Sequence, residues 1–144
     1  MDALVSQIAI IANDVYTSLG PGYNEVIYHR AMEVGLRLNG IRYESEVITP
    51  VYYKGHNIGH GRVDIKLDNL IIELKAIGMM NNEALVQTKN YMKHYGLTTG
   101  MVINFGQSVK HTLSTNLNIV LLRDETIYDL VGSNFFPRPA ELTL

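Results

Sequence analysis

Apolar side chains recur at helical spacing over the first part of the chain. A repeat of three or four positions predicts an amphipathic helix over residues 3–18, carried by Leu4, Ile8, Ile11, Val15 and Leu19. Gly20-Pro21-Gly22 ends this helix. A second helix is predicted from about Asn24, a residue type that caps helices, to Leu38. Its expected apolar stripe consists of Ile27, Ala31, Val34 and Leu38.

The pattern changes to strict alternation on either side of Asp68-Asn69. Alternation on both sides of a turn-forming pair predicts a β-hairpin with a two-residue loop. In that register Asp64 lies directly opposite Glu73 on one face, and Lys75 shares the face because strand side chains alternate. The apolar positions are expected to point the other way, into a core: Val63, Ile65, Leu67, Ile72 and Leu74.

The remaining elements complete a mixed sheet. Residues 41–53 predict a strand or a bent pair of strands, in which Pro50 marks an edge or a bulge. A helix is predicted from Asn81 or Asn82 to about Tyr95, and the apolar run 100–106 predicts a buried strand parallel to the Glu73 strand. A further strand is predicted over 117–122. We therefore expect an α/β fold, a mainly antiparallel sheet with helices on both faces, in the order ααβββαββ.

Composition bounds these predictions. The chain has 144 residues, expected to form a single domain over 1–144, and it has no cysteine, which excludes disulfides, thiolate zinc sites and a cysteine nucleophile. No apolar run is long enough to span a membrane, and Asp2 is unlike a secretory leader, so we expect an intracellular protein, cytoplasmic or associated with DNA. The net charge of −2 gives no global nucleic-acid signature.

The polar face of the hairpin carries the candidate chemistry. Cleavage of a phosphodiester needs a hard divalent cation with oxygen ligands, which two carboxylates can supply. A lysine beside the cation can hold or deprotonate the attacking water, or neutralise the developing anion. An acid pair with Lys75 is also compatible with an ordinary hairpin whose outer face carries solvated charges.

These motifs resemble a known nuclease superfamily. Asp64 followed by Glu73-Leu74-Lys75 on adjacent strands resembles the core of the PD-(D/E)xK nucleases, which have the restriction-endonuclease-like fold. Gly22-x-x-Glu25-x-x-Tyr28, then Tyr52-Tyr53-Lys54-Gly55, resembles the GxxExxY family, which is usually grouped with them. The resemblance covers roughly residues 15–106.

The resemblance implies roles for individual residues. It implies Mg²⁺ or Mn²⁺ held by Asp64, Glu73, Glu25 and the Leu74 carbonyl, with Lys75 as the catalytic lysine. Gln87-x-x-x-Tyr91 is similar to the helix of RecB-type members, in which the glutamine supports the site. Tyr28, Arg62 and Tyr91 are expected to contact substrate. Glu25 and Gln87 also have simpler explanations. Acids favour the N-termini of helices, where Glu25 lies, and a glutamine such as Gln87 suits an exposed helix face.

The function that these expectations favour is a metal-dependent nuclease acting on DNA. The alternatives are a module that binds nucleic acid or protein without cutting, and an inactive scaffold with a structural ion-pair cluster. A homodimer is expected because one chain supplies one site and cutting both strands needs two. The apolar segment Phe135-Phe136-Pro137 offers a surface for it.

Overall fold

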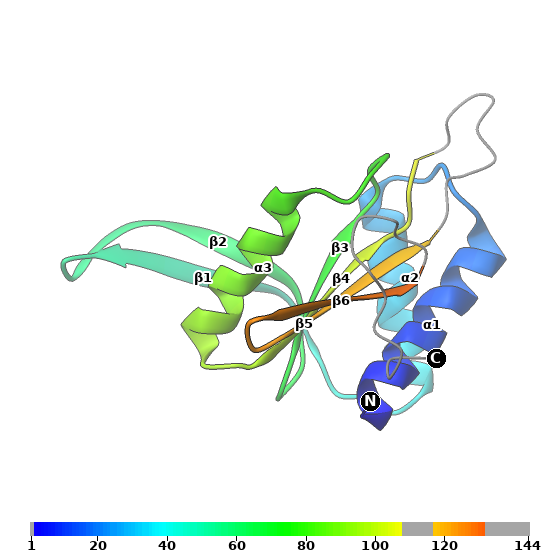
Figure 1. Ribbon diagram of the computed structural model, residues 1–144, viewed down its shortest axis with the longest axis horizontal. Coiled ribbons are helices and arrows are strands. Elements are labelled where there is room, and N and C mark those ends of the chain that lie inside the picture. Colours follow the sequence, from blue (N-terminus) through cyan, green and yellow to red (C-terminus); the bar gives the residue numbers. More distant parts are fainter. Residues whose placement is uncertain (1, 108–116, 132–144) are drawn as a thin grey trace.

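The computed structural model describes residues 2–107 and 117–131, which form three helices and six strands (Figure 1). The helices are α1 (Ala3–Leu19), α2 (Glu25–Leu38) and α3 (Asn82–Tyr95). The strands are β1 (Glu44–Tyr53), β2 (His56–Lys66), β3 (Ile71–Lys75), β4 (Thr99–Asn104), β5 (Asn118–Arg123) and β6 (Thr126–Val131). The predicted order is confirmed through β5, and β6 follows it.

All six strands belong to one sheet whose order follows the chain, β1-β2-β3-β4-β5-β6. Every neighbouring pair is antiparallel except β3 and β4, which run parallel because α3 crosses between them. α1 and α2 cover one face and α3 covers the other, each over its own buried apolar cluster. The α/β fold with helices on both faces is therefore confirmed.

Local sequence signals account for the ends of two helices. The Asp2 side chain accepts a hydrogen bond from the Val5 N–H at 2.8 Å, and the Asn81 side chain accepts one from the Ala84 N–H at 2.9 Å. Each bond satisfies one of the N–H groups that the first turn leaves without a partner in the helix. Gly96 ends α3 in the left-handed conformation at φ 65°.

The buried face of α2 differs from the prediction. Most of the expected stripe lies outward, with Val34 45% and Leu38 82% exposed, and of its members Ala31 packs against the core. Tyr28, Met32 and Leu36 are buried instead. The physical reason is the partner of this helix, because the Tyr28 ring stacks on Phe105 of the sheet layer at a centroid distance of 4.4 Å. Both stripes have helical spacing, so periodicity alone could not choose between them.

The strand β6 is the element that sequence analysis missed. Its alternation is broken by Asp129, which is polar but only 1% exposed, so the pattern does not predict a strand there. The apolar segment Phe135-Phe136-Pro137 lies outside the described residues. Within the described ranges, no helix is long and apolar enough to cross a membrane.

Candidate active site

The β2–β3 hairpin has the predicted register. Ile65 pairs with Ile72 and Lys66 with Ile71, and the Leu67 N–H donates to the Leu70 carbonyl at 2.9 Å, which closes the two-residue loop. Beyond Ile65 and Ile72 the ladder between these strands stops. β2 continues along β1 while β3 continues along β4, so a gap begins where Asp64 and Glu73 face each other.

The twist at this gap also corrects one detail of the sequence analysis. Val63 packs in the cluster under α3, whereas Ile65 and Leu67 of the same strand pack in the cluster under α1 and α2. Opposite the bend, Glu46 of β1 has a positive φ of 54° and no partner in the β1–β2 register. A change of sheet face along one strand cannot be seen in an alternating pattern.

Two carboxylates fill the gap and replace main-chain pairing. The Leu74 N–H donates to Oδ2 of Asp64 at 2.8 Å, and the Asp64 N–H donates to Oε1 of Glu73 at 3.3 Å. Both side chains are buried, with Asp64 8% and Glu73 2% exposed. The acids are therefore fixed in position by the backbone of the neighbouring strand.

Burial and mutual repulsion perturb the ionisation of this pair. Burial, followed by the charge of Asp64, raises the pKa of Glu73 to about 9, while the Asp64 N–H and Lys75 act in the opposite direction. Two carboxylates that share a buried site cannot both ionise at low cost. Glu73 consequently retains a proton at neutral pH when no cation is near.

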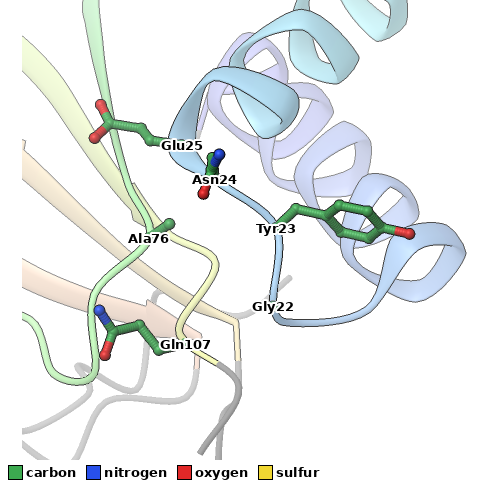
Figure 2. A pocket seen from close by; sticks show the side chains of 6 residues that line it. All are labelled: Gly22, Tyr23, Asn24, Glu25, Ala76 and Gln107. Carbon is green, nitrogen blue, oxygen red and sulfur yellow. The ribbon is translucent and has the colours of Figure 1, made fainter.

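Glu25 extends from the first turn of α2 toward this pair. Figure 2 shows its side chain directed at the β3 strand, beside Ala76. Its pKa is raised, first by burial and then by the charge of Asp64, while Lys75, His29 and Arg62 lower it. A cavity of about 320 Å³ opens next to it, lined by Gly22, Tyr23, Asn24, Glu25, Ala76 and Gln107.

The end of β3 supplies a cation and a carbonyl. Lys75 is partly buried at the last position of the strand, and its carbonyl accepts the Phe105 N–H at 2.9 Å on the β4 side. Successive residues of a strand direct their main-chain groups to opposite sides. The Leu74 carbonyl therefore points toward β2 and the gap, as its N–H does toward Asp64.

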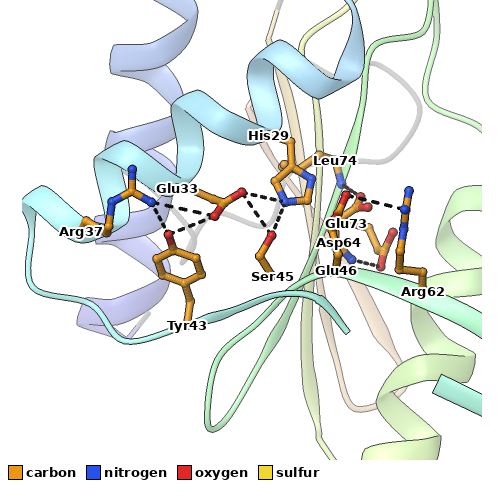
Figure 3. A network of polar contacts seen from close by, with 10 residues as sticks. All are labelled: His29, Glu33, Arg37, Tyr43, Ser45, Glu46, Arg62, Asp64, Glu73 and Leu74. Atoms are coloured by element: carbon orange, nitrogen blue, oxygen red, sulfur yellow. Dashed lines mark hydrogen bonds and ion pairs between the residues drawn. The ribbon is translucent and has the colours of Figure 1, made fainter. Parts of the chain in front are cut away.

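A polar network that sequence analysis missed ties α2 to β1 beside the acids (Figure 3). His29 Nε2 lies 2.9 Å from Ser45 Oγ and 3.3 Å from Glu33 Oε2. Ser45 and Tyr43 also donate to Glu33, at 3.1 and 3.0 Å. The signal was present in the sequence, because Glu25, His29 and Glu33 recur at intervals of four residues and so share a helix face.

Gln87 and Tyr91 of α3 reach β2 rather than the acids directly. The Tyr91 hydroxyl accepts the Arg62 N–H at 3.0 Å, and the Gln87 amide lies 3.5 Å from the same hydroxyl. Tyr91 crosses Gly61 so closely that an added Cβ would lie 2.4 Å from the hydroxyl oxygen. This pair supports the backbone that leads into Asp64. The Arg62 side chain is exposed and lies 3.6 Å from Glu46.

Tyr28 does not have the surface position expected of a substrate contact. Its side chain is 0% exposed. Its hydroxyl donates to the Gly20 carbonyl at 2.6 Å and accepts the Tyr23 N–H at 3.3 Å. Tyr28 therefore fixes the loop between α1 and α2, which sets the direction from which Glu25 approaches the sheet.

The oxygen atoms gathered at the gap are of the chemical type that binds a hard divalent cation. Carboxylate and carbonyl oxygens are the ligands that Mg²⁺ and Mn²⁺ prefer, and a cation would remove the repulsion that keeps Glu73 protonated. Among the described residues, no group of three or more His, Asp or Glu is gathered closely enough to hold an ion by itself. Asp64 and Glu73 would thus supply part of the coordination, and water or phosphate the rest.

Comparisons with known proteins agree with this geometry. A crystal structure titled SSO0001 has a TM-score of 0.53 to this chain at 17% identity, which shows a shared fold. The alignment covers 71% of this chain and only 51% of that one. Comparison with curated protein sequences gives no match. The model of the PD-(D/E)XK nuclease superfamily matches residues 2–115. Because this match includes the hairpin, both acids and Lys75, the chain belongs to the PD-(D/E)XK nuclease superfamily.

Proposed function

We propose that this protein is a Mg²⁺- or Mn²⁺-dependent nuclease that hydrolyses phosphodiester bonds in DNA. The observation that carries the proposal is the buried pair Asp64 and Glu73 in the gap between β2 and β3. Burying two carboxyl groups side by side is costly, because they repel when both are ionised and one must otherwise keep a proton, and a bound divalent cation would offset this cost. The spacing of Gly22, Glu25 and Tyr28 further supports placing the chain in the GxxExxY group.

The proposed ligands are Asp64 and Glu73, with the Leu74 carbonyl and Glu25 as additional donors. When bound, the cation would acidify a water and stabilise negative charge on the phosphoryl oxygens. Asp64 is oriented for this role by the Leu74 N–H, and Glu73 by the Asp64 N–H. Glu25 approaches from α2, on the side of the cavity through which a phosphate could enter.

Lys75 is proposed as the catalytic lysine. It lies on the same strand as Glu73, and its charge acts on both Glu73 and Glu25. In hydrolysis a water oxygen bonds to phosphorus, the bond to the leaving sugar oxygen breaks, and that oxygen gains a proton. Lys75 can hold or deprotonate the attacking water, or neutralise the anion as it develops. Gln87 would act through Tyr91, by fixing the β2 backbone next to Asp64.

A binding module that does not cut is the second candidate. The observation in its favour is that the described residues contain no ready-made cluster of three ligands. Such a module would use the same fold to hold nucleic acid or a protein partner, and its acids would not need a metal.

Cleavage in the presence of Mn²⁺ separates the two candidates. The substrates are plasmid, linear duplex, single-stranded and junction DNA, with Asp64→Asn and Lys75→Met as inactive controls. We expect cleavage of at least one substrate by the parent protein and none by either variant. No cleavage of any substrate, or equal cleavage by the variants and the parent, would reject the nuclease at this site.

We also propose a homodimer for cleavage of both strands of a duplex. One chain supplies one pair of acids, so two copies related by symmetry would place one site at each strand. Light scattering at micromolar concentration measures this. A mass of one chain, about 16.2 kDa, unchanged by metal or DNA, would favour single-strand nicking or trimming.

A further inference from the structure

The strands β1 and β2 extend beyond the rest of the molecule as a two-stranded arm (Figure 1). We define the arm as residues 47–63, which pair only between β1 and β2. Its base is fixed by α3, through the Thr49 hydroxyl at 2.7 Å from the Tyr95 hydroxyl and through the bond from the Arg62 N–H to Tyr91. Past the base, every residue from Val51 to His60 is exposed.

One face of the arm leads into the candidate active site. Thr49 and Gly61 face α3, where they meet Tyr95 and Tyr91. Side chains alternate along a strand, so His60 and Arg62 lie on the opposite face. Arg62 and Asp64 are both close enough to Glu25 of α2 for their charges to act on it. With a rise of about 3.3 Å per residue, His60 lies roughly 13 Å along the strand from Asp64.

The arm exposes large apolar and aromatic side chains that its own fold does not cover. The exposed fractions are 57% for Ile48, 47% for Val51, 58% for Tyr52, 60% for Tyr53 and 64% for Ile58. A two-stranded ribbon buries too little surface to be stable alone, and exposed apolar surface of this kind marks an interaction site.

The charge of the arm is opposite to that of the rest of the chain. Residues 47–63 contain Lys54, Arg62, His56 and His60 and no Asp or Glu. Removing Lys54 and Arg62 from the total leaves 10 basic against 14 acidic residues, a formal −4 for the remainder. Glu46, just outside the arm, lies 3.6 Å from Arg62 and shares its charge. Lys54 and the two histidines are the other basic side chains, and a segment that itself holds no acid, on an acidic protein, suits a polyanionic partner.

The turn at the tip of the arm contains a lysine at a position whose backbone conformation favours other residues. Lys54 and Gly55 both have positive φ, 48° and 80°, between the paired residues Tyr53 and His56. A two-residue turn of this type favours Asn-Gly, because a side chain such as that of lysine is strained at positive φ. Lys54 thus keeps a strained backbone and places a cation at the most distant point of the arm. Retained strain of this kind is typical of residues that contact a ligand.

We propose that the arm binds duplex DNA by lying in the major groove and spanning its width. Lys54 would then contact the phosphate chain on one side of the groove, and Arg62 the phosphate chain on the other side. Six residues separate the level of Arg62, which pairs with Ile48, from Lys54. They span about 20 Å, more than the roughly 12 Å width of the major groove, which admits a two-stranded ribbon. The exposed Tyr52, Tyr53 and Ile58 would contact sugars and bases. The inference rests on the proposed function in naming DNA as the polyanion.

A second copy of the chain is the competing partner for this surface. Exchange of arms between two copies would cover the apolar side chains but would bring the two cationic arms together. Charge therefore favours DNA. The alternative is tested by comparing the mass in solution of the arm variants with that of the parent, because only a dimer held by the arms would change its mass.

Binding of a fluorescein-labelled 20-base-pair DNA duplex, measured by anisotropy in EDTA so that nothing is cut, tests the arm. The first variant is Lys54→Asn, which removes the cation and creates the favoured Asn-Gly turn, so the melting temperature should not fall. The second is Tyr52→Ser with Tyr53→Ser. The matched control is Lys93→Gln, which removes one exposed lysine from α3.

The parent protein should bind, and Lys54→Asn should reduce the slope of log K against log salt by about 0.9, as expected for one lost phosphate contact. The tyrosine pair should weaken binding by about tenfold or more, because two large aromatic side chains would no longer be buried against the duplex, and Lys93→Gln should change it less than twofold. Binding that is equal in all variants overturns the proposal. A change of mass with unchanged DNA binding assigns the arm to a dimer and also overturns it.

The experiments distinguish a failure of the proposed nuclease function from a failure of the proposed role of the arm. If the protein is a binding module, arm-dependent binding in EDTA persists while no substrate is cut with Mn²⁺. If the arm is irrelevant, cleavage by Lys54→Asn and by the tyrosine variant equals that of the parent at every salt concentration.

Discussion

Replacing Glu73 by glutamine should stabilise the metal-free protein, increasingly so as the pH rises. The raised pKa of Glu73, about 9, means that the folded protein keeps a proton which the unfolded chain releases near the ordinary value of 4.5. Its contribution to stability is complete below the ordinary pKa and is lost as the pH rises toward 9. Glutamine has the same shape, keeps the oxygen that accepts the Asp64 N–H, and does not titrate.

The expected size follows from linkage. One proton held by the folded state alone changes the free energy of unfolding by about 1.4 kcal/mol per pH unit. Between pH 6 and pH 8 the parent should therefore lose up to about 3 kcal/mol of stability that Glu73→Gln does not lose. For a chain of this size, the difference in melting temperature between Glu73→Gln and the parent should therefore grow by roughly 8 °C from pH 6 to pH 8.

The assay is thermal and urea unfolding at pH 6, 7 and 8, in EDTA and again with Mn²⁺. Glu44→Gln is the control, because it makes the same change of side chain at an exposed position at the start of β1. In EDTA only Glu73→Gln should diverge from the parent with pH. Mn²⁺ should raise the melting temperature of the parent and not that of Glu73→Gln. Parallel pH profiles for parent and variant would refute the buried, protonated Glu73.

Two substitutions test other parts of the site, and one measurement tests the proposed dimer. Gly61→Ala should destabilise the protein by about 1–3 kcal/mol, because its Cβ would lie 2.4 Å from the Tyr91 hydroxyl, and pairing it with Tyr91→Phe should recover part of the loss in urea unfolding. Tyr28→Phe should cost about 1 kcal/mol by removing the bond to the Gly20 carbonyl while the stack on Phe105 remains, and an unchanged urea midpoint would contradict this. Light scattering should give the mass of two chains, and a monomer at all concentrations would contradict the homodimer.

The sequence by itself determined those features that depend on short-range physics. Asp68-Asn69 between two alternating runs fixed the register that brings Asp64 opposite Glu73, because a two-residue loop leaves one pairing. Asn81 or Asn82 and Gly96 marked the ends of α3, because a side-chain cap and a left-handed residue act within one turn; Asn81 is the cap in the structure. The parallel direction of β4 followed from the helix that precedes it. These signals predicted the location of the candidate site and the types of its residues.

Only the tertiary structure decided which faces are buried and what burial does to the acids. α2 turns Tyr28 inward because Phe105, distant in sequence, offers a ring to stack on. Val63 and Ile65 enter different cores because the sheet twists between them. The divergence of β2 from β3 lets the Asp64 side chain take the Leu74 N–H, and burial beside Asp64 raises the pKa of Glu73. Desolvation depends on everything packed around a group, and so no local pattern encodes it.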